Sequence, residues 1–161
     1  MKPPPVICNA RVLEYAVTGD AVFTGELQLY VAGVSLGAVP GLAICESLNC
    51  DELLLFHCDD DWDVLGIQAW KKSEGPDVNS VEQVKSRAEK YYAGISSHWM
   101  VHDACFEDAL AYREYLVGDH RCSFCSRTMY EVESLVEGNG GASICNLCVT
   151  RFHEEVDETR G

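Results

Sequence analysis

Two Cys-x-x-Cys pairs near the C-terminus are the residues best suited to chemistry in this 161-residue sequence. Cys122 and Cys125 form the first pair, Cys145 and Cys148 form the second, and 19 residues separate them. Two residues between thiolates allow a tight turn to aim both sulfurs at one ion, and two such turns complete a tetrahedron. The spacing therefore predicts one structural Zn²⁺ ion per chain, held by these four cysteines. Because four thiolates leave no position for water, we expect no catalytic role for the metal.

The cysteine count gives the alternatives to a zinc site. Nine cysteines are an odd number, which argues against a fully paired disulfide scaffold and favours a reducing compartment. The alternatives for the two C-terminal pairs are four buried thiols or two redox pairs, and the spacing disfavours both. The remaining cysteines are scattered among apolar residues: Cys8, Cys45, Cys50, Cys58 and Cys105.

The tail that carries the pairs is too short to hold a core of its own. Residues 121–161 need a bound metal or a cross-link to fold stably. Zinc binding in such peptides contributes on the order of 10–16 kcal/mol of folding free energy. Between the pairs we expect a short helix over residues 129–137 that ends at Gly138. After Cys148, apolar residues at helical spacing predict a second helix with Val149, Phe152 and Val156 on one face. Since so small a module cannot cover that face, we expect it to contact a partner chain.

Other residues around the cysteines form a more specific pattern. They are Cys122-Ser-Phe-Cys125, Glu131-Val132, Leu135-Val136, Gly138, Ile144-Cys-Asn-Leu-Cys-Val149 and Glu154-Glu155. Over about residues 120–158 this pattern resembles the N-terminal zinc-binding domain of ClpX, the unfoldase partner of the ClpP protease. The loop 138–143 is one residue longer than is usual for that family. No GxxxxGK[ST] motif occurs in the sequence, so we do not expect an ATPase.

The resemblance implies a treble-clef-like zinc fold from a bacterial protein, which dimerises and binds adaptor proteins or substrates. It implies that the zinc ligands are Cys122, Cys125, Cys145 and Cys148. It also implies a small core and dimer face made of Phe124, Leu135, Ile144, Leu147 and Val149, to which the helical pattern adds Phe152.

The sequence of residues 1–118 predicts an acidic α+β domain with an antiparallel sheet. The predicted zinc finger follows over residues 119–161. Strands are expected over 6–17 and 26–31, joined as a hairpin through the turn at 18–20, and over 53–56 and 64–70 on either side of an acidic turn. Ser80 with Gln83 resembles a capping box, which predicts a helix from 81 that ends near Gly94. Asp103 is expected to cap another helix.

The net charge and the hydropathy of the chain argue against some classes of function. The chain is 47% hydrophobic, enough for a real core, and its formal net charge is −14. Up to residue 120 there are eight basic and nineteen acidic residues. Such a chain repels phosphate backbones, so we expect no nucleic-acid partner. No apolar stretch is long enough for a membrane span, and we expect a cytoplasmic protein.

The leading hypothesis is a non-enzymatic protein that binds another protein, an adaptor, a substrate or an unknown target, and forms a homodimer. One alternative is a nucleic-acid-binding zinc ribbon that uses Arg121, Arg127 and Arg151. The other is an enzyme with a site in residues 1–118 around His57, His98 or His102.

Motifs that would support an enzyme or a second metal are incomplete. A zinc protease would need Glu at Trp99, between His98 and His102. Adjacent strand residues such as His57 and Cys58 point to opposite faces, which prevents a thiol–base pair. Asp59, Asp61 and Asp63 begin like a calcium loop, but the glycine and glutamate that such a loop needs are missing.

Overall fold

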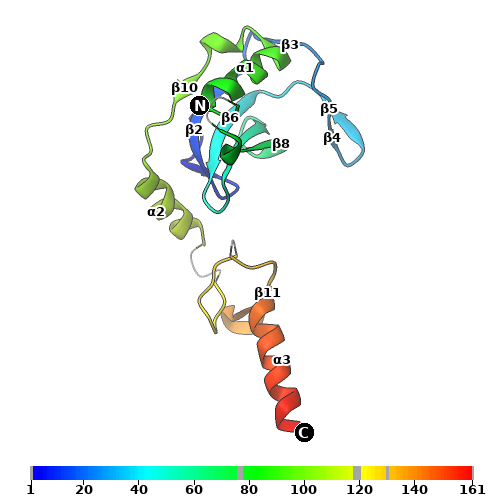
Figure 1. Ribbon diagram of the computed structural model, residues 1–161, viewed down its shortest axis with the longest axis vertical. Coiled ribbons are helices and arrows are strands. Elements are labelled where there is room, and N and C mark those ends of the chain that lie inside the picture. The colour runs from blue at the N-terminus through cyan, green and yellow to red at the C-terminus, as the bar shows by residue number, and fades with distance from the viewer. Residues whose placement is uncertain (1, 76–77, 118–120, 130, 161) are drawn as a thin grey trace. The chain divides into compact units, whose positions relative to one another are not determined.

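The computed structural model describes residues 2–75, 78–117, 121–129 and 131–160. The chain divides into two compact units, Met1–Leu110 and Ala111–Gly161, and each is described by itself (Figure 1). Helix α2 (Phe106–Val117) contributes to both units. The predicted domain boundary between residues 118 and 119 lies outside the described residues.

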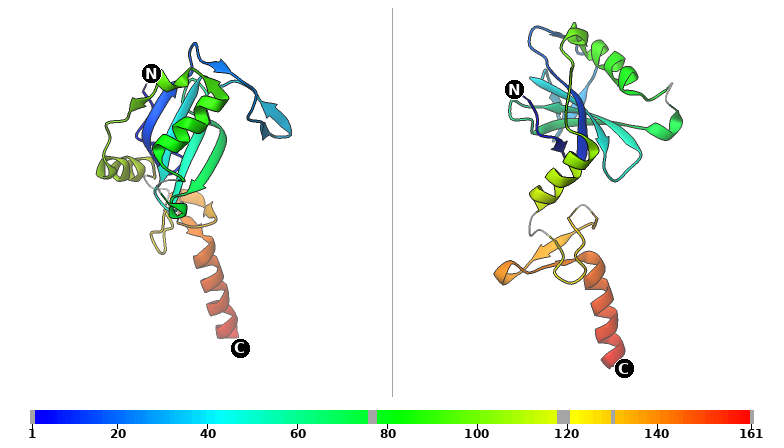
Figure 2. Two further views of the ribbon diagram at one scale, coloured as in Figure 1. Left: turned by 45° about the horizontal axis from the view of Figure 1, so that its top comes forward. Right: turned by 90° about the vertical axis from the view of Figure 1, so that its left-hand side faces the viewer.

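The first unit is built on a curled antiparallel sheet in the order β1-β2-β6-β7-β8, with β10 beside β1 on the outer edge of β2 (Figure 2). Its strands are β1 (Val6–Ile7), β2 (Ala10–Val17), β6 (Gly41–Ser47), β7 (Glu52–Cys58), β8 (Val64–Lys71) and β10 (Met100–Val101). Two small pairs lie outside it, β3 (Val22–Phe23) with β9 (Tyr92–Ala93) and β4 (Leu29–Val31) with β5 (Val34–Leu36). The 3-10 turns are η1 (Lys72–Glu74) and η2 (Ile95–Ser97). The α+β class with an antiparallel sheet is confirmed.

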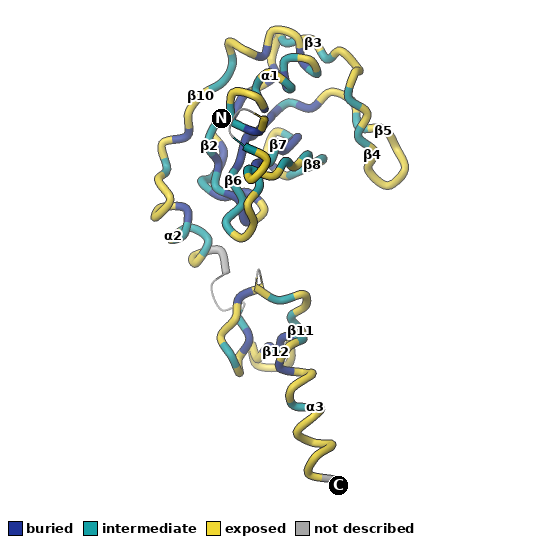
Figure 3. The backbone as a smooth tube through the Cα atoms, in the orientation of Figure 1, coloured by how far each residue is buried: buried dark blue, intermediate teal, exposed yellow. Residues whose placement is uncertain are grey.

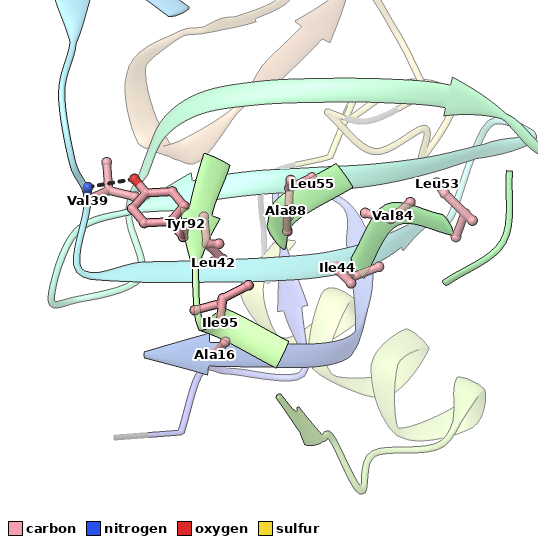
Figure 4. Packing of buried hydrophobic residues seen from close by; sticks show 10 residues of the cluster. All are labelled: Ala16, Val39, Leu42, Ile44, Leu53, Leu55, Val84, Ala88, Tyr92 and Ile95. Carbon is pink, nitrogen blue, oxygen red and sulfur yellow. Dashed lines mark hydrogen bonds between the residues drawn. The ribbon is translucent and has the colours of Figure 1, made fainter. Parts of the chain in front are cut away.

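Helix α1 (Val81–Tyr91) covers one face of the sheet (Figure 4). Ser80 caps it as predicted, because its Oγ accepts the Gln83 N–H at 3.2 Å. Its buried residues Val84 and Ala88 pack against a set of apolar side chains from the sheet and the following turn: Ala16, Leu42, Ile44, Leu53, Leu55 and Ile95. The helix ends before the predicted stop, and Gly94 instead adopts φ +92° at the start of η2.

The opposite face of the sheet has its own core, and Figure 3 shows that the central strands, which contribute to both cores, are largely buried. Alternation along β7 sends Leu53 and Leu55 toward α1, whereas Phe56 and Cys58 point to the other core. Trp62 closes that second core with its ring edge on Tyr15, at a centroid distance of 5.7 Å. The sheet is therefore a two-sided scaffold.

The predicted hairpin between 6–17 and 26–31 is wrong. Strand β2 pairs with β6, and only Leu29–Val31 of the second stretch is extended, paired with β5. Ala32 and Gly33 have φ values of 51° and 80°, which form the two-residue turn that closes a local hairpin. Its Leu29 then covers Gly66 of β8, where a Cβ would lie 2.9 Å from the leucine Cδ1.

The predicted cap at Asp103 is also wrong. Helix α2 begins at Phe106, and the Cys105 carbonyl accepts the Ala109 N–H at 3.1 Å. Asp108 supplies the local side-chain bond by accepting the Cys105 N–H. Asp103 instead forms an ion pair with Lys2, so the interaction with a distant segment replaces the local cap.

Glu46 on β6 lies between two cations. Arg11 Nη2 is 3.4 Å from its carboxylate, and Lys72 also pairs with it. The hydrogen bond from Lys72 lowers the pKa of Glu46, against the opposing effect of partial burial. A carboxyl whose pKa is lowered on folding stabilises the protein above its unfolded pKa, and this contribution disappears as pH falls through the folded value.

We therefore expect Glu46→Gln to lower the free energy of unfolding by up to about 1 kcal/mol at neutral pH, a small value because the side chain is partly exposed. Urea titrations at pH 7 and at about pH 3 check this, since the difference from wild type should vanish at the acidic pH. Glu26→Gln at an exposed position is the control. An equal loss at both pH values would contradict the electrostatic origin.

Candidate metal centre

The four predicted ligands come together in the second unit. The Sγ atoms of Cys122, Cys125, Cys145 and Cys148 all lie within 4.8 Å of one another. Two sulfur pairs are 3.7 Å apart, Cys122 with Cys148 and Cys125 with Cys145. A tetrahedron with Zn–S bonds of about 2.3 Å has edges of about 3.8 Å, so the sulfur spacing fits one zinc ion. These cysteines form a binding site for one structural Zn²⁺.

The first pair is held by a tight turn. The Ser126 N–H donates to the Cys122 carbonyl at 2.9 Å, and Ser126 itself has φ 64°. The Cys122 N–H in turn donates to the Arg127 carbonyl at 2.9 Å. These bonds curl the backbone so that both sulfurs of the pair face the same point.

A β-hairpin and a helix position the second pair. Strands β11 (Leu135–Glu137) and β12 (Ser143–Cys145) pair across the short turn η3 (Asn139–Gly141), and helix α3 (Asn146–Arg160) follows directly. Cys145 ends the strand and Cys148 lies in the first turn of the helix. Thiolates at a helix N-terminus are favoured by its unpaired N–H groups. A knuckle, a hairpin and a helix make this a treble-clef-like fold.

The predicted helix over residues 129–137 is wrong, because residues 135–137 form strand β11. Val136 pairs with Ile144 and Leu135 pairs with Cys145. The backbone of the ligand-bearing strand needs a hydrogen-bonding partner, and this long-range requirement outweighs the local helical spacing of the apolar residues. Tyr130 lies outside the described residues.

Asn146 has a positioning role that the sequence interpretation missed. Its Oδ1 accepts the N–H groups of Glu133 and Ser134 at 3.1 and 3.2 Å, and its own N–H donates to the Ser134 carbonyl. Asn at the start of a helix, inside a Cys-x-x-Cys pair, was the signal available in the sequence. A second hydrogen bond joins strand β12 to the first cysteine turn, because the Ser143 N–H donates to the Ser123 Oγ at 2.9 Å.

Backbone N–H groups and neighbouring sulfurs change the pKa values of the cysteine thiols. Burial opposes ionisation of Cys122, but the N–H groups of Cys145, Phe124 and Cys125 point at its sulfur and lower its pKa to about 6. Burial and the neighbouring sulfurs raise the pKa of Cys148 to about 12. The backbone N–H of Arg127 lowers the pKa of Cys125, and the Arg127 side chain also bonds to this thiol. Zinc binds cysteine as thiolate, so metal binding at this cluster is coupled to loss of thiol protons.

The residues predicted as core and partner face divide into two groups. Leu135, Ile144 and Phe152 are half-buried against the cysteines. Phe124, Leu147 and Val149 are exposed, with 60% of Phe124 accessible to solvent. The Phe124 ring stands edge-on to Phe152 at a centroid distance of 5.1 Å. The first group is thus a small core, and the second consists of exposed apolar side chains on different sides of the finger.

The arginines of the alternative nucleic-acid hypothesis are engaged separately. Arg121 pairs with Glu114, Arg127 contacts the thiol of Cys125, and Arg151 lies over the Phe152 ring at 4.5 Å. They do not form a free basic patch in the described part of the finger.

The histidines near the cysteines are not among the ligand atoms described. His153 is exposed and 3.3 Å from Asp157, and His120 lies outside the described residues. In the first unit, three histidines have separate contacts. His57 bonds Gln68 at 3.2 Å, His98 bonds the Val17 carbonyl and Asp20, and buried His102 bonds the Pro3 carbonyl. The structure does not bring these residues together as a catalytic group.

The finger also matches a known family. Residues 120–158 match the family described as the ClpX C4-type zinc finger, which confirms the resemblance. This match and the sulfur geometry together confirm the zinc ligands. No curated protein and no solved structure matches the chain. In the described residues, no helix has the length and apolar character needed to cross a membrane.

Proposed function

We propose that this protein is a non-enzymatic, cytoplasmic interaction protein whose zinc finger binds a second protein chain. The finger would form a homodimer or hold an adaptor or substrate protein. The first unit would contribute a second binding surface of acidic character, and no ATPase activity is involved.

The observation that carries this proposal is the apolar surface beside a closed metal centre. Phe124, Leu147, Val149 and Val156 are 47–60% exposed. A shallow hollow of about 420 Å³ is lined by Phe124, Phe152 and Val156, with Glu155 and Thr159 at the helix. An apolar hollow with a polar rim is typical of a protein–protein contact. Val149 lies on the same face of α3 as Phe152 and Val156, whereas Leu147 lies on the opposite face.

The metal gives this surface its rigidity. Phe124 lies between the ligands Cys122 and Cys125, while Phe152 stands one helical turn after Cys148. Zinc fixes both cysteine pairs in one tetrahedron, so it also fixes the two aromatic rings against each other. A pre-ordered aromatic pair loses little side-chain entropy on binding, which favours its use as an anchor.

The chemistry of the site supports a non-catalytic role. Four cysteines complete the coordination of zinc, so no position is left for a water or a substrate atom. The other five cysteines are free thiols, which fits a reducing compartment such as the cytoplasm.

We expect Phe124→Asp to weaken binding of the partner chain at least about tenfold, because it places a charge in the apolar anchor. The zinc content should stay at one ion per chain, since the side chain is exposed and is not a ligand. Sedimentation velocity measures self-association, and affinity capture from the source cells measures other partners. Glu158→Gln, at an exposed position on helix α3 outside the hollow, is the control. Unchanged association and capture in Phe124→Asp, with zinc retained, would reject the proposal.

A further inference from the structure

The turn between β11 and β12 contains an asparagine that is followed by glycine. Asn139 begins the turn η3, and Gly140 within it has φ 72° and ψ 20°. The sequence has no other Asn-Gly pair. An asparagine reacts with its own backbone when the nitrogen of the next residue attacks the carbon of the side-chain amide. Glycine favours this attack, because it has no Cβ beside the nitrogen and adopts backbone conformations that other residues disfavour.

The surroundings of Asn139 leave both reacting groups accessible. Its side chain is exposed and forms no hydrogen bond within the described residues. The i→i+3 bonds of a three-residue 3-10 turn are donated by its last residue and by the next one, here Gly141 and Ala142. The turn therefore does not use the N–H of Gly140, and no hydrogen bond from that N–H occurs elsewhere within the described residues. A Cβ added at Gly140 would meet open space.

Three other asparagines are held by burial or by hydrogen bonds. Asn146 accepts two backbone N–H groups through its side-chain oxygen at the start of α3. Asn79 is 3% exposed and donates through Nδ2 to the Lys71 carbonyl at 2.8 Å. Asn9 is 9% exposed, and the residue after it, Ala10, belongs to the β2–β6 ladder. These restraints keep the amide carbon and the next nitrogen away from the geometry of attack.

Asn49 is the closest comparison, because it is exposed like Asn139. The N–H of the next residue, Cys50, donates to the Oγ of Ser47 at 3.0 Å, and Cys50 also carries a side chain beside that nitrogen. A nitrogen that is fixed by a hydrogen bond is poorly placed to attack. The two asparagines thus differ in the attacking nitrogen, whereas their exposure to solvent is alike.

We propose that Asn139 is a site of spontaneous modification through a cyclic imide. The Gly140 nitrogen loses its proton and bonds to Cγ of Asn139, the Cγ–Nδ2 bond breaks, and Nδ2 leaves as ammonia. Water then opens the imide. Cleavage of the new N–Cγ bond gives aspartate, and cleavage of the original peptide bond gives isoaspartate. The overall reaction consumes one water and releases one ammonia, with no oxidation or reduction.

The modification changes the hairpin that carries a zinc ligand. Either product adds a negative charge to the turn, and isoaspartate also lengthens the backbone by one methylene. The Gly138 N–H donates to the Ala142 carbonyl at 2.7 Å and closes the loop next to the turn. Glu137 then pairs with Ser143 before the strand reaches Cys145. These bonds separate the turn from the ligand, so we expect the modified chain to retain its zinc.

Incubation of the full zinc-loaded chain at neutral and at mildly alkaline pH, followed by peptide mass mapping, tests this site. We expect Asn139 to be converted at least about tenfold faster than Asn49, because its attacking nitrogen is neither hydrogen-bonded nor hindered. The rate should rise with pH, since this nitrogen must lose its proton. Methylation by a protein isoaspartyl methyltransferase identifies the isoaspartate product. Metal analysis should give one zinc ion per chain before and after incubation.

Asn139→Gln is the matched variant, because it keeps the amide but would have to form a less favourable six-membered ring. It should abolish modification of the turn without changing the zinc content. Gly140→Ala should slow the reaction at least about tenfold, since it places a Cβ beside the attacking nitrogen. An Asn139 that stays intact at mildly alkaline pH, or that reacts no faster than Asn49, overturns the inference. No partner chain enters this test, so its outcome is independent of the proposed function.

Discussion

Replacing Cys125 and Cys148 with serine is expected to abolish zinc binding and to unfold the finger, while the first unit stays folded. Among its described residues the finger has one small apolar cluster, which surrounds the cysteines, so the metal supplies most of its folding energy. Structural zinc contributes on the order of 10–16 kcal/mol in such modules, far more than the loss of one apolar contact. Metal analysis should fall from one zinc ion per chain to none, and amide resonances of residues 121–160 should collapse to unfolded positions.

The matched control for this change is Cys50→Ser with Cys105→Ser. Both thiols are exposed and lie outside the metal cluster, so the variant should retain one zinc ion and both folded units. Retention of a full equivalent of zinc by Cys125→Ser, Cys148→Ser would contradict the ligand assignment. So would the absence of metal from wild-type protein purified without chelator.

Tyr92→Ala is expected to cause the largest loss of stability in the first unit, about 3–5 kcal/mol, since it leaves a cavity beneath α1. Tyr92 is 1% exposed, and its ring packs on Phe23 at a centroid distance of 5.3 Å. Its Oη accepts the buried Val39 N–H at 2.9 Å, as Figure 4 shows. Tyr92→Phe keeps the ring but leaves that donor unpaired, so we expect a smaller loss of about 1–3 kcal/mol.

Urea unfolding of the two variants separates the contribution of the ring from that of the hydrogen bond. Tyr30→Ala is the control, because Tyr30 is 64% exposed on the β4–β5 hairpin, and surface changes of this kind alter stability by less than about 0.5 kcal/mol. Equal losses in Tyr92→Phe and Tyr92→Ala would show that the ring contributes nothing beyond its hydroxyl, contrary to the packing described.

The metal centre was predictable from sequence because the requirements of ligation are local. Two residues between thiolates set the turn, and the four ligands follow from two such turns. The segment between the turns was not predictable in the same way. Leu135 and Val136 occur at a spacing compatible with a helix, yet they form β11, since the strand that ends in Cys145 needs a partner.

In the first unit, too, local features were predictable from the sequence and long-range strand pairing was not. Helix α1 was predicted correctly from its cap, and the acidic turn between β7 and β8 was predicted from consecutive aspartates. The pairing of β2 with β6 was not, because it joins residues about thirty positions apart and no local signal specifies it. Gly41 illustrates the difficulty. It resembles a turn residue, but it begins the central strand β6, where a Cβ would lie 2.9 Å from the Trp62 ring.

The distribution of aromatic residues gives each unit a different optical character. Trp62, Trp70 and Trp99 all belong to Met1–Leu110, and the finger has no tryptophan. Trp62 is 6% exposed in the core that faces away from α1, so we expect the emission of an indole shielded from water. Intrinsic fluorescence therefore follows unfolding of the first unit and does not directly report on the finger. Zinc loss that leaves the emission spectrum unchanged would mean that the two units fold as independent thermodynamic bodies, and a shift would measure the energy that couples them.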